Sequence, residues 1–173
     1  VIKLDMPPGN PYIFRTRSAS DNPLVDVRNR LLEPFVKAYK TNHEQYQNGN
    51  WIKDNLLFAG ELMLGHLRYG TYGSSGETFC HPFLRQNNWM TRNLVLAGNF
   101  NLTNNNEMFE MLVELGQHPR NRTDTVVVME KIGHFLDEAI DAIFRKYKSK
   151  GLQHTKITEC IIDELDLSIV LKK

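Results

Sequence analysis

The most informative stretch of the sequence is GHLRYGTYG, residues 65–73. An apolar run over residues 56–67 predicts a strand, and residues 70–76 are rich in glycine and serine, as expected for a loop. Arg68 therefore lies where a strand is predicted to end and a loop to begin. Its planar guanidinium suits bidentate pairing with a carboxylate. The residues alone leave two interpretations open: a site for a bound carboxylate, or a surface ion pair.

Two later segments add polar groups of complementary chemistry. LAGNFNLTN, residues 96–104, follows a predicted strand over Trp89–Ala97 and precedes a predicted helix. The Asn99 amide and neighbouring backbone N–H groups could hold a developing oxyanion. Asp124 opens the longest predicted helix and could bind an ammonium group, although a helix N-terminus stabilises a carboxylate without any ligand. Together with Arg68, these groups fit a site for a free amino acid.

Four motifs follow one another along the chain: GHLRYGT (residues 65–71), HPF (81–83), NLTN (101–104) and TDT (123–125). In this order and at this spacing they resemble the class II glutamine amidotransferases, whose glutaminase domain belongs to the N-terminal nucleophile hydrolases. The NLTN element, with the preceding PF, is most similar to the amidophosphoribosyltransferases. Glucosamine-6-phosphate synthases have a different continuation there.

The resemblance implies an α+β fold. We expect part of a four-layer αββα N-terminal-nucleophile hydrolase fold, with an inserted helical segment and a helical C-terminal part. Residues 1–173 would form one incomplete glutaminase domain, and the insertion would lie near residues 21–54. Because the sequence opens on Val1 within a strand-like run, we expect it to be a piece of a longer protein.

The resemblance also implies a role for each matching position. Arg68 would bind the α-carboxylate of glutamine, and Thr71 would line the same pocket. Asp124 would bind the α-ammonium. The Asn99 side chain and the backbone N–H of Phe100 would form the oxyanion hole. In the family, an N-terminal cysteine attacks the glutamine amide with its own α-amine as base, a thioester forms, and ammonia is released. In the amidophosphoribosyltransferases, this ammonia is transferred to phosphoribosyl pyrophosphate in the first step of purine synthesis.

The sequence departs from the family pattern at several places. The nucleophile is expected upstream of Val1, and Cys80 is no substitute, so we predict that this polypeptide alone does not hydrolyse glutamine. Gly98-Asn99-Phe100 stands where the family usually has His-Asn-Gly, and phenylalanine would be strained if that glycine has positive φ. The phosphoribosyltransferase domain, with its substrate and Mg²⁺, is also absent, and no cofactor is expected within these residues.

Periodicity and turn residues predict most of the remaining elements. Residues 1–4 and 12–15 should pair as a hairpin, residues 43–50 should form a loop, and Leu94–Leu96 should be a strand buried on both faces. One helix is expected to begin at Pro23, with Asn22 as its cap. Two more should cover residues 104–115 and 123–149, closed by Gly116 and Gly151. Two short helices should follow, capped by Thr155 and Asp166. The predicted core stripe of the longest helix is Val128, Ile132, Phe135, Ala139, Ile140, Ile143 and Tyr147.

The composition is ordinary for a globular protein. Of 173 residues, 41% are hydrophobic and 24% charged, and the net charge of +1 gives no reason to expect nucleic acid or an acidic membrane as partner. No apolar run approaches a membrane span. Cys80 and Cys160 lack CxxC spacing and fit a reducing, cytoplasmic compartment. We expect a homo-oligomer whose small-molecule partner is glutamine.

Other interpretations of single features remain open. His66 and His81 could bind a metal ion, but they are expected to pack in the core. Glu130 and His134 could form half of a metal site. A solvated helix face that also includes Asp137 and Asp141 is the favoured interpretation. The whole protein could be another class II amidotransferase, such as a glucosamine-6-phosphate synthase, or a non-catalytic module that binds an amino acid. A Cys-Gly encoded directly upstream would favour the enzyme.

Overall fold

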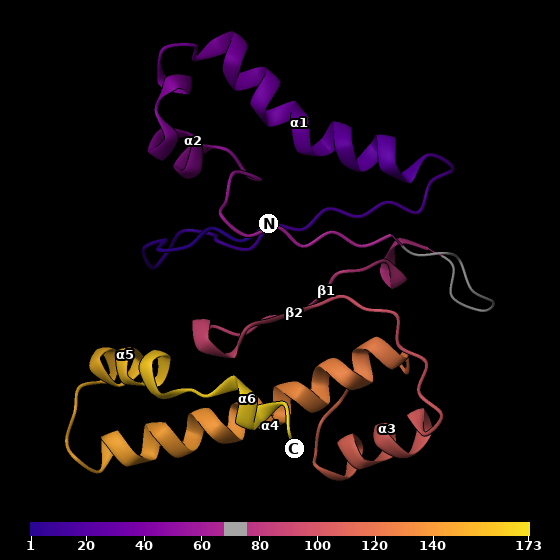
Figure 1. Cartoon of the computed structure of the whole chain (residues 1–173), viewed down its shortest axis with the longest axis vertical. Coiled ribbons are helices and arrows are strands. Elements are labelled where there is room, and N and C mark those ends of the chain that lie inside the picture. The colour runs from indigo at the N-terminus through magenta and orange to yellow at the C-terminus, as the bar shows by residue number, and fades with distance from the viewer. Residues whose placement is uncertain (68–75) are drawn as a thin grey trace. The chain divides into compact units, whose positions relative to one another are not determined.

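The computed structural model describes residues 1–67 and 76–173, so Arg68 and Thr71 lie outside the described residues. The chain divides into two compact units, Val1–Pro82 and Phe83–Lys173, called here the first and second units (Figure 1). The described residues form helices and one two-stranded antiparallel sheet, in agreement with the predicted α+β class. Among them, no helix combines the length and the apolar character needed to cross a bilayer.

The N-terminal segment of the first unit pairs as predicted but only over a short stretch. Ile2 forms an antiparallel bridge with Ile13, and Lys3 N–H donates to the Tyr12 carbonyl at 2.8 Å. The predicted strand over residues 56–67 is wrong. In this stretch, which the structure describes completely, Leu62 makes a single bridge to Ile2, and most of the apolar side chains that follow are exposed. An apolar run needs a long partner strand to become a strand itself, and Ile2 offers one bridge only.

Helix α1 (Pro23–Thr41) begins with Pro23 in its first turn, as predicted, since proline loses no hydrogen bond there. Asn22 stands in the cap position, but its side chain makes no cap hydrogen bond. The predicted loop over residues 43–50 is wrong, because Gln45–Gln47 form a 3₁₀ turn and α2 (Gly49–Asn55) starts inside it. The missed signal is Asn48, whose Oδ1 accepts hydrogen bonds from two backbone N–H groups at the start of α2.

The core of the first unit is small. Ala38, Leu56 and Ala59 are buried where α1 meets α2, with Phe35, Tyr46, Trp51 and Ile52 packed around them. Lys3 is also buried: its ammonium donates to the Lys53 carbonyl and lies 4.8 Å from the centre of the Phe14 ring. Burial lowers the pKa of Lys3, although the nearby carboxylates of Asp54 and Glu61 act in the opposite direction.

The second unit contains the sheet. Strands β1 (Phe83–Arg85) and β2 (Leu94–Leu96) pair antiparallel, with Phe83 opposite Leu96, and a 3₁₀ turn over Met90–Arg92 precedes β2. The predicted strand at Leu94–Leu96 is confirmed, but its predicted extent over Trp89–Ala97 and its burial on both faces are wrong. All three residues of β2 are only half-buried, because the sheet has two strands and only α4 packs against it among the described helices.

Four helices complete the second unit (Figure 1). They are α3 (Asn105–Glu114), α4 (Asp124–Lys148), α5 (His154–Glu164) and α6 (Leu167–Val170). The two long predicted helices are confirmed to within a residue, and the glycines expected to close them, Gly116 and Gly151, both have positive φ. The predicted cap at Thr155 is wrong: α5 begins at His154, with Gln153 in the cap position.

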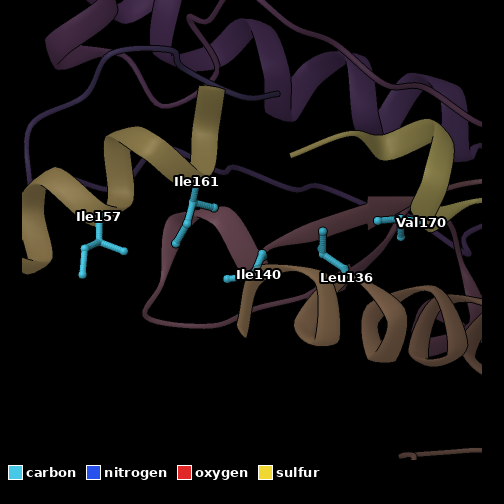
Figure 2. Packing of buried hydrophobic residues seen from close by; sticks show 5 residues of the cluster. All are labelled: Leu136, Ile140, Ile157, Ile161 and Val170. Carbon is cyan, nitrogen blue, oxygen red and sulfur yellow. The ribbon is translucent and has the colours of Figure 1, made fainter. Parts of the chain in front are cut away.

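Helix α4 organises the core of this unit. Near its start, Val126 and Met129 pack with Phe83, Leu94 and Leu96 of the sheet. Further along, its buried side chains face α5 and α6. Figure 2 shows this cluster, which consists of Leu136, Ile140, Ile157, Ile161 and Val170.

The predicted core stripe of α4 is only partly right. Ile140 is fully buried, whereas its other members are half-buried and line the edge. The buried line is shifted to Val126, Met129, Gly133, Leu136 and Ile140. The shift arises because α4 carries two sets of partners, the sheet near its start and two short helices near its end, and both lie along the same line of residues.

Helix α6 begins at a confirmed cap. The Asp166 carboxylate accepts the backbone N–H of Ser168 at 2.8 Å. Hydrogen bonds from Ser168, through its side chain and its backbone, hold the pKa of Asp166 below its ordinary value. A lowered carboxyl pKa contributes stability that is present above the unfolded pKa and is lost as the pH falls through the folded one.

We therefore expect Asp166→Ala to lower the urea midpoint of the chain near neutral pH, and to lower it less at a pH below both pKa values, where the neutral carboxyl still accepts the cap hydrogen bond. Asp166→Asn should keep most of the stability at either pH, because asparagine caps helices about as well and does not titrate. Urea unfolding followed by circular dichroism at both pH values measures this. Equal losses for the alanine variant at both pH values would contradict a role for the charge.

Candidate functional site

Asp124, the first residue of α4, contacts the loop that follows β2. Its Oδ2 accepts the backbone N–H of Leu102 at 2.9 Å. The carboxylate is half-buried and stands at the positive end of the α4 dipole, which favours its charge. Two predicted site segments, the loop of residues 97–104 and the start of α4, thus lie against each other within the second unit.

Further hydrogen bonds fix the entry to α4. The Asn121 side chain accepts both the backbone N–H and the hydroxyl of Thr123, at 3.0 and 2.7 Å. The Asn105 amide, at the start of α3, donates to the Arg122 carbonyl at 2.7 Å. The N-termini of α3 and α4 are therefore joined, which gives Asp124 a defined position.

Asn99 and Phe100 lie in the loop after β2. The Asn99 side chain is exposed, and Phe100 is half-buried. Among residues 1–67 and 76–173, Asp5 is the only non-glycine residue with positive φ. Phe100 therefore does not have the positive φ that would strain its backbone. The ring of Phe100 lies against Gly98: a Cβ placed on Gly98 would stand 2.6 Å from ring atoms Cε2 and Cζ. The glycine of this segment therefore makes room for the ring.

The structure describes only part of the predicted set. It brings the loop that carries Asn99 and Phe100 next to Asp124, through Leu102. Arg68 and Thr71 lie outside the described residues, and the first unit is not placed relative to the second. Their place beside Asp124 stays a prediction.

His66 and His81 contact each other in the first unit, which the sequence did not indicate. Their ring centres are 4.4 Å apart, and His81 is buried. The two residues lie on either side of the glycine-rich segment in the sequence. Because they are far apart along the chain, local sequence patterns do not predict their contact. Among the described residues, no three histidine, cysteine, aspartate or glutamate side chains gather as a metal site would need.

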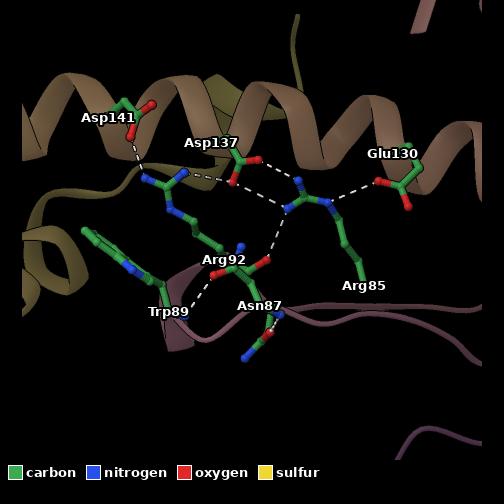
Figure 3. Close-up of polar contacts among 8 residues, drawn as sticks. Arg85, Asn87, Trp89, Arg92, Glu130, Asp137 and Asp141 are labelled. Atoms are coloured by element: carbon green, nitrogen blue, oxygen red, sulfur yellow. Dashed lines mark hydrogen bonds and ion pairs between the residues drawn. The ribbon is translucent and has the colours of Figure 1, made fainter. Parts of the chain in front are cut away.

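The polar face of α4 is not a solvated face, contrary to the prediction. Figure 3 shows that its carboxylates pair with two arginines from the sheet region. Arg85 Nε lies 3.2 Å from Glu130, and its NH2 group 2.5 Å from Asp137. Arg92 pairs with Asp141 and reaches Asp137 at 3.5 Å. The acidic spacing along α4 was visible in the sequence, but its partners were not.

This network attaches the sheet to α4. Burial opposes the charge of Arg85, but hydrogen bonds and attraction from Asp137 and Glu130 outweigh it, so the pKa of Arg85 lies above its ordinary value. Arg92 also lies 4.9 Å from the centre of the Trp89 ring. Glu130 is thus engaged with Arg85, while His134 lies 3.4 Å from Glu138, so neither residue needs a metal ion to explain it.

An open groove of about 590 Å³ runs along α1 in the first unit. It is lined by Arg28, Asn29, Leu32, Glu33, Val36, Lys37 and Lys40. Of the predicted site residues that the structure describes, Asn99, Phe100 and Asp124, none lines it. The motifs indicate the Asp124 region and not this groove.

One comparison with a known protein agrees with the resemblance drawn from the motifs. No family model and no solved structure matches the chain. The chain is 31% identical over 90 residues to a glutamine--fructose-6-phosphate aminotransferase [isomerizing] of Sulfurisphaera tokodaii, an alignment that covers 52% of this chain and 14% of that protein. The chain is therefore similar, over about half its own length, to a small part of an aminotransferase that is named for glutamine.

Proposed function

We propose that residues 1–173 belong to the glutaminase domain of a class II glutamine amidotransferase. The observation that carries the proposal is the hydrogen bond from Leu102 to Asp124, which joins the loop holding Asn99 and Phe100 to the start of α4. The similarity to an aminotransferase named for glutamine supports it independently. The N-terminal-nucleophile hydrolase fold, with residues 21–54 as a helical insertion, is part of the same proposal.

Each group has a chemical task in this site. One oxygen of Asp124 holds Leu102, which leaves the other to accept the α-ammonium of glutamine. Arg68 binds the α-carboxylate, and Thr71 lines the same pocket. The thiolate of a cysteine supplied by the intact protein attacks the side-chain amide carbon, and the carbonyl oxygen becomes an oxyanion that the Asn99 amide and the Phe100 N–H stabilise. The C–N bond then breaks, ammonia leaves with the proton that the cysteine's own α-amine took from its thiol, and water later hydrolyses the thioester to glutamate.

Two acceptors for the ammonia are candidates. The NLTN and PF elements favour phosphoribosyl pyrophosphate, which would bind with Mg²⁺ in a phosphoribosyltransferase domain of the intact protein and start purine synthesis. The aminotransferase relative favours fructose-6-phosphate instead. Glutamate release by the intact protein, measured with glutamine and either acceptor, separates them: the true acceptor raises the rate and the other does not. If neither acceptor is consumed, a module that only binds an amino acid is the better description.

The binding of glutamine to the chain tests the assignment of Asp124. We expect Asp124→Asn to weaken L-glutamine binding about 10- to 30-fold, because a hydrogen-bonded ion pair with the α-ammonium is lost. Asparagine still offers an oxygen to the Leu102 N–H, so the fold should persist. Titration calorimetry should show no difference between the two proteins for 4-carbamoylbutanoate, the analogue of glutamine that lacks the α-amino group.

Asp163→Asn provides the matched control, since Asp163 is exposed on α5. It should bind glutamine as the unmodified chain does. Equal weakening for glutamine and its analogue would show that Asp124→Asn acts through the fold. A failure of the unmodified chain to bind glutamine at millimolar concentration would count against the proposed function itself.

A further inference from the structure

The ring of Phe100 folds back onto Gly98, two residues earlier in the chain. A Cβ on Gly98 would lie 2.6 Å from both Cε2 and Cζ of the ring, and 3.4 Å from Cδ2. Cβ atoms essentially never approach other atoms below 3.0 Å, so no side chain larger than hydrogen fits at position 98 while the ring stays where it is. The two residues therefore depend on each other.

Asn99 lies between these two residues in the chain. In an extended chain, residues two apart share one face and the residue between them faces the other way. Phe100 is half-buried against Gly98, and Asn99 is exposed, as this alternation requires. Phe100 does not have positive φ, so its backbone makes no left-handed turn here.

The far end of the loop is held separately. Leu102 N–H donates to Asp124 at 2.9 Å, two residues beyond Phe100. The segment from Gly98 to Leu102 is thus fixed at one end by an aromatic contact and at the other by a charged hydrogen bond. Between these points lie the Asn99 amide and the Phe100 N–H, both of which need a fixed direction to stabilise an oxyanion.

We propose that Gly98 and Phe100 act as one positioning pair that sets the direction of the Asn99 amide and of the Phe100 N–H; this inference rests on the proposed function. The pair would act through the backbone that it positions and not through contact with glutamine. A misplacement of about 1 Å in such a donor costs a large factor in catalysis, so the pair should matter although it lies behind the reacting atoms.

A double-mutant cycle on the full chain tests the pair. Gly98→Ala should weaken L-glutamine binding about tenfold, because the new Cβ displaces the ring and with it the Asn99 backbone. Phe100→Ala should weaken it less, by loosening the loop. In the Phe100→Ala background, Gly98→Ala should have no further effect, since the ring that it would meet is gone. Gly49→Ala is the control: a Cβ on Gly49 meets nothing within 4 Å, and binding should be unchanged.

A second measurement separates positioning from general stability. In NMR spectra, glutamine should shift the Asn99 side-chain amide and the Phe100 backbone amide, and Gly98→Ala should move the same resonances in the free chain while the urea midpoint stays within error. If Gly98→Ala weakens glutamine binding equally in the unmodified chain and in the Phe100→Ala background, or in neither, the positioning pair is wrong. The proposed function is unaffected by that result. If the unmodified chain binds no glutamine, the proposed function fails, and unchanged Asn99 resonances in free Gly98→Ala then overturn the pair as well.

Discussion

Replacing Ile161 by alanine lowers the free energy of unfolding of the chain by about 3 kcal/mol, whereas the same replacement at Ile162 changes it by less than about 1 kcal/mol. The two residues are neighbours in α5, and alanine raises helix propensity equally at both. Only burial differs: Ile161 is 1% exposed and packs among the residues of Figure 2, while Ile162 is 54% exposed. The difference between the two variants therefore reports the cavity left at Ile161.

Urea unfolding followed by tryptophan fluorescence measures this comparison. Trp89 lies in the second unit with its ring centre 5.4 Å from that of Phe144, so its emission reports that unit. Trp51→Phe removes the other tryptophan, which lies in the first unit. Similar losses for the two alanine variants would mean that α5 does not pack on α4 as the structure has it.

Long periodic segments were predicted well from the sequence. The helices at residues 105–114 and 124–148 repeat apolar residues over several turns, and their closing glycines adopt the positive φ expected of them. Such signals are local, since a helix forms its backbone hydrogen bonds within itself. The start of α2 was missed only because the capping role of Asn48 was not recognised.

Strands could not be predicted in the same way. Residues 56–67 and 89–97 are both apolar, yet the first forms a single bridge and the second contains a three-residue strand after a 3₁₀ turn. Whether an apolar run becomes a strand depends on a partner elsewhere in the chain. The acidic spacing on α4 had the same limit: the residues were visible, but their pairing with Arg85 and Arg92 depends on how the sheet packs.

The candidate site was predicted through its motifs and only partly through physical reasoning. Nothing in the residue types of LAGNFNLTN indicates that Leu102 donates to Asp124, which lies 22 positions further along the chain. The order of the motifs placed the two segments in one expected site, but it did not indicate this hydrogen bond. The contact between Gly98 and Phe100 has no signal in the sequence, because the space that a glycine leaves is filled only once the chain folds.

Gly133, in the middle of α4, likewise leaves room for a neighbouring side chain that a Cβ would exclude. A Cβ on Gly133 would lie 2.5 Å from Nε, 2.7 Å from Cδ and 2.8 Å from Cζ of Arg85. The guanidinium therefore lies directly on the helix backbone, between Glu130 and Asp137 (Figure 3). A free arginine side chain could swing away from an added methyl group, but this one is held by two carboxylates.

The effect of Gly133→Ala should consequently change sign with the residue at position 85. In the unmodified chain we expect a loss of about 1–2 kcal/mol of stability, because the ion pairs of Arg85 are disturbed by more than the roughly 1 kcal/mol that alanine contributes over glycine inside a helix. In an Arg85→Ala background, itself less stable, Gly133→Ala should stabilise by about 1 kcal/mol, since only the propensity term remains. Urea midpoints of the four proteins measure the coupling. If Gly133→Ala stabilises both backgrounds equally, Arg85 does not rest on the helix, and the attachment of the sheet to α4 must have another cause.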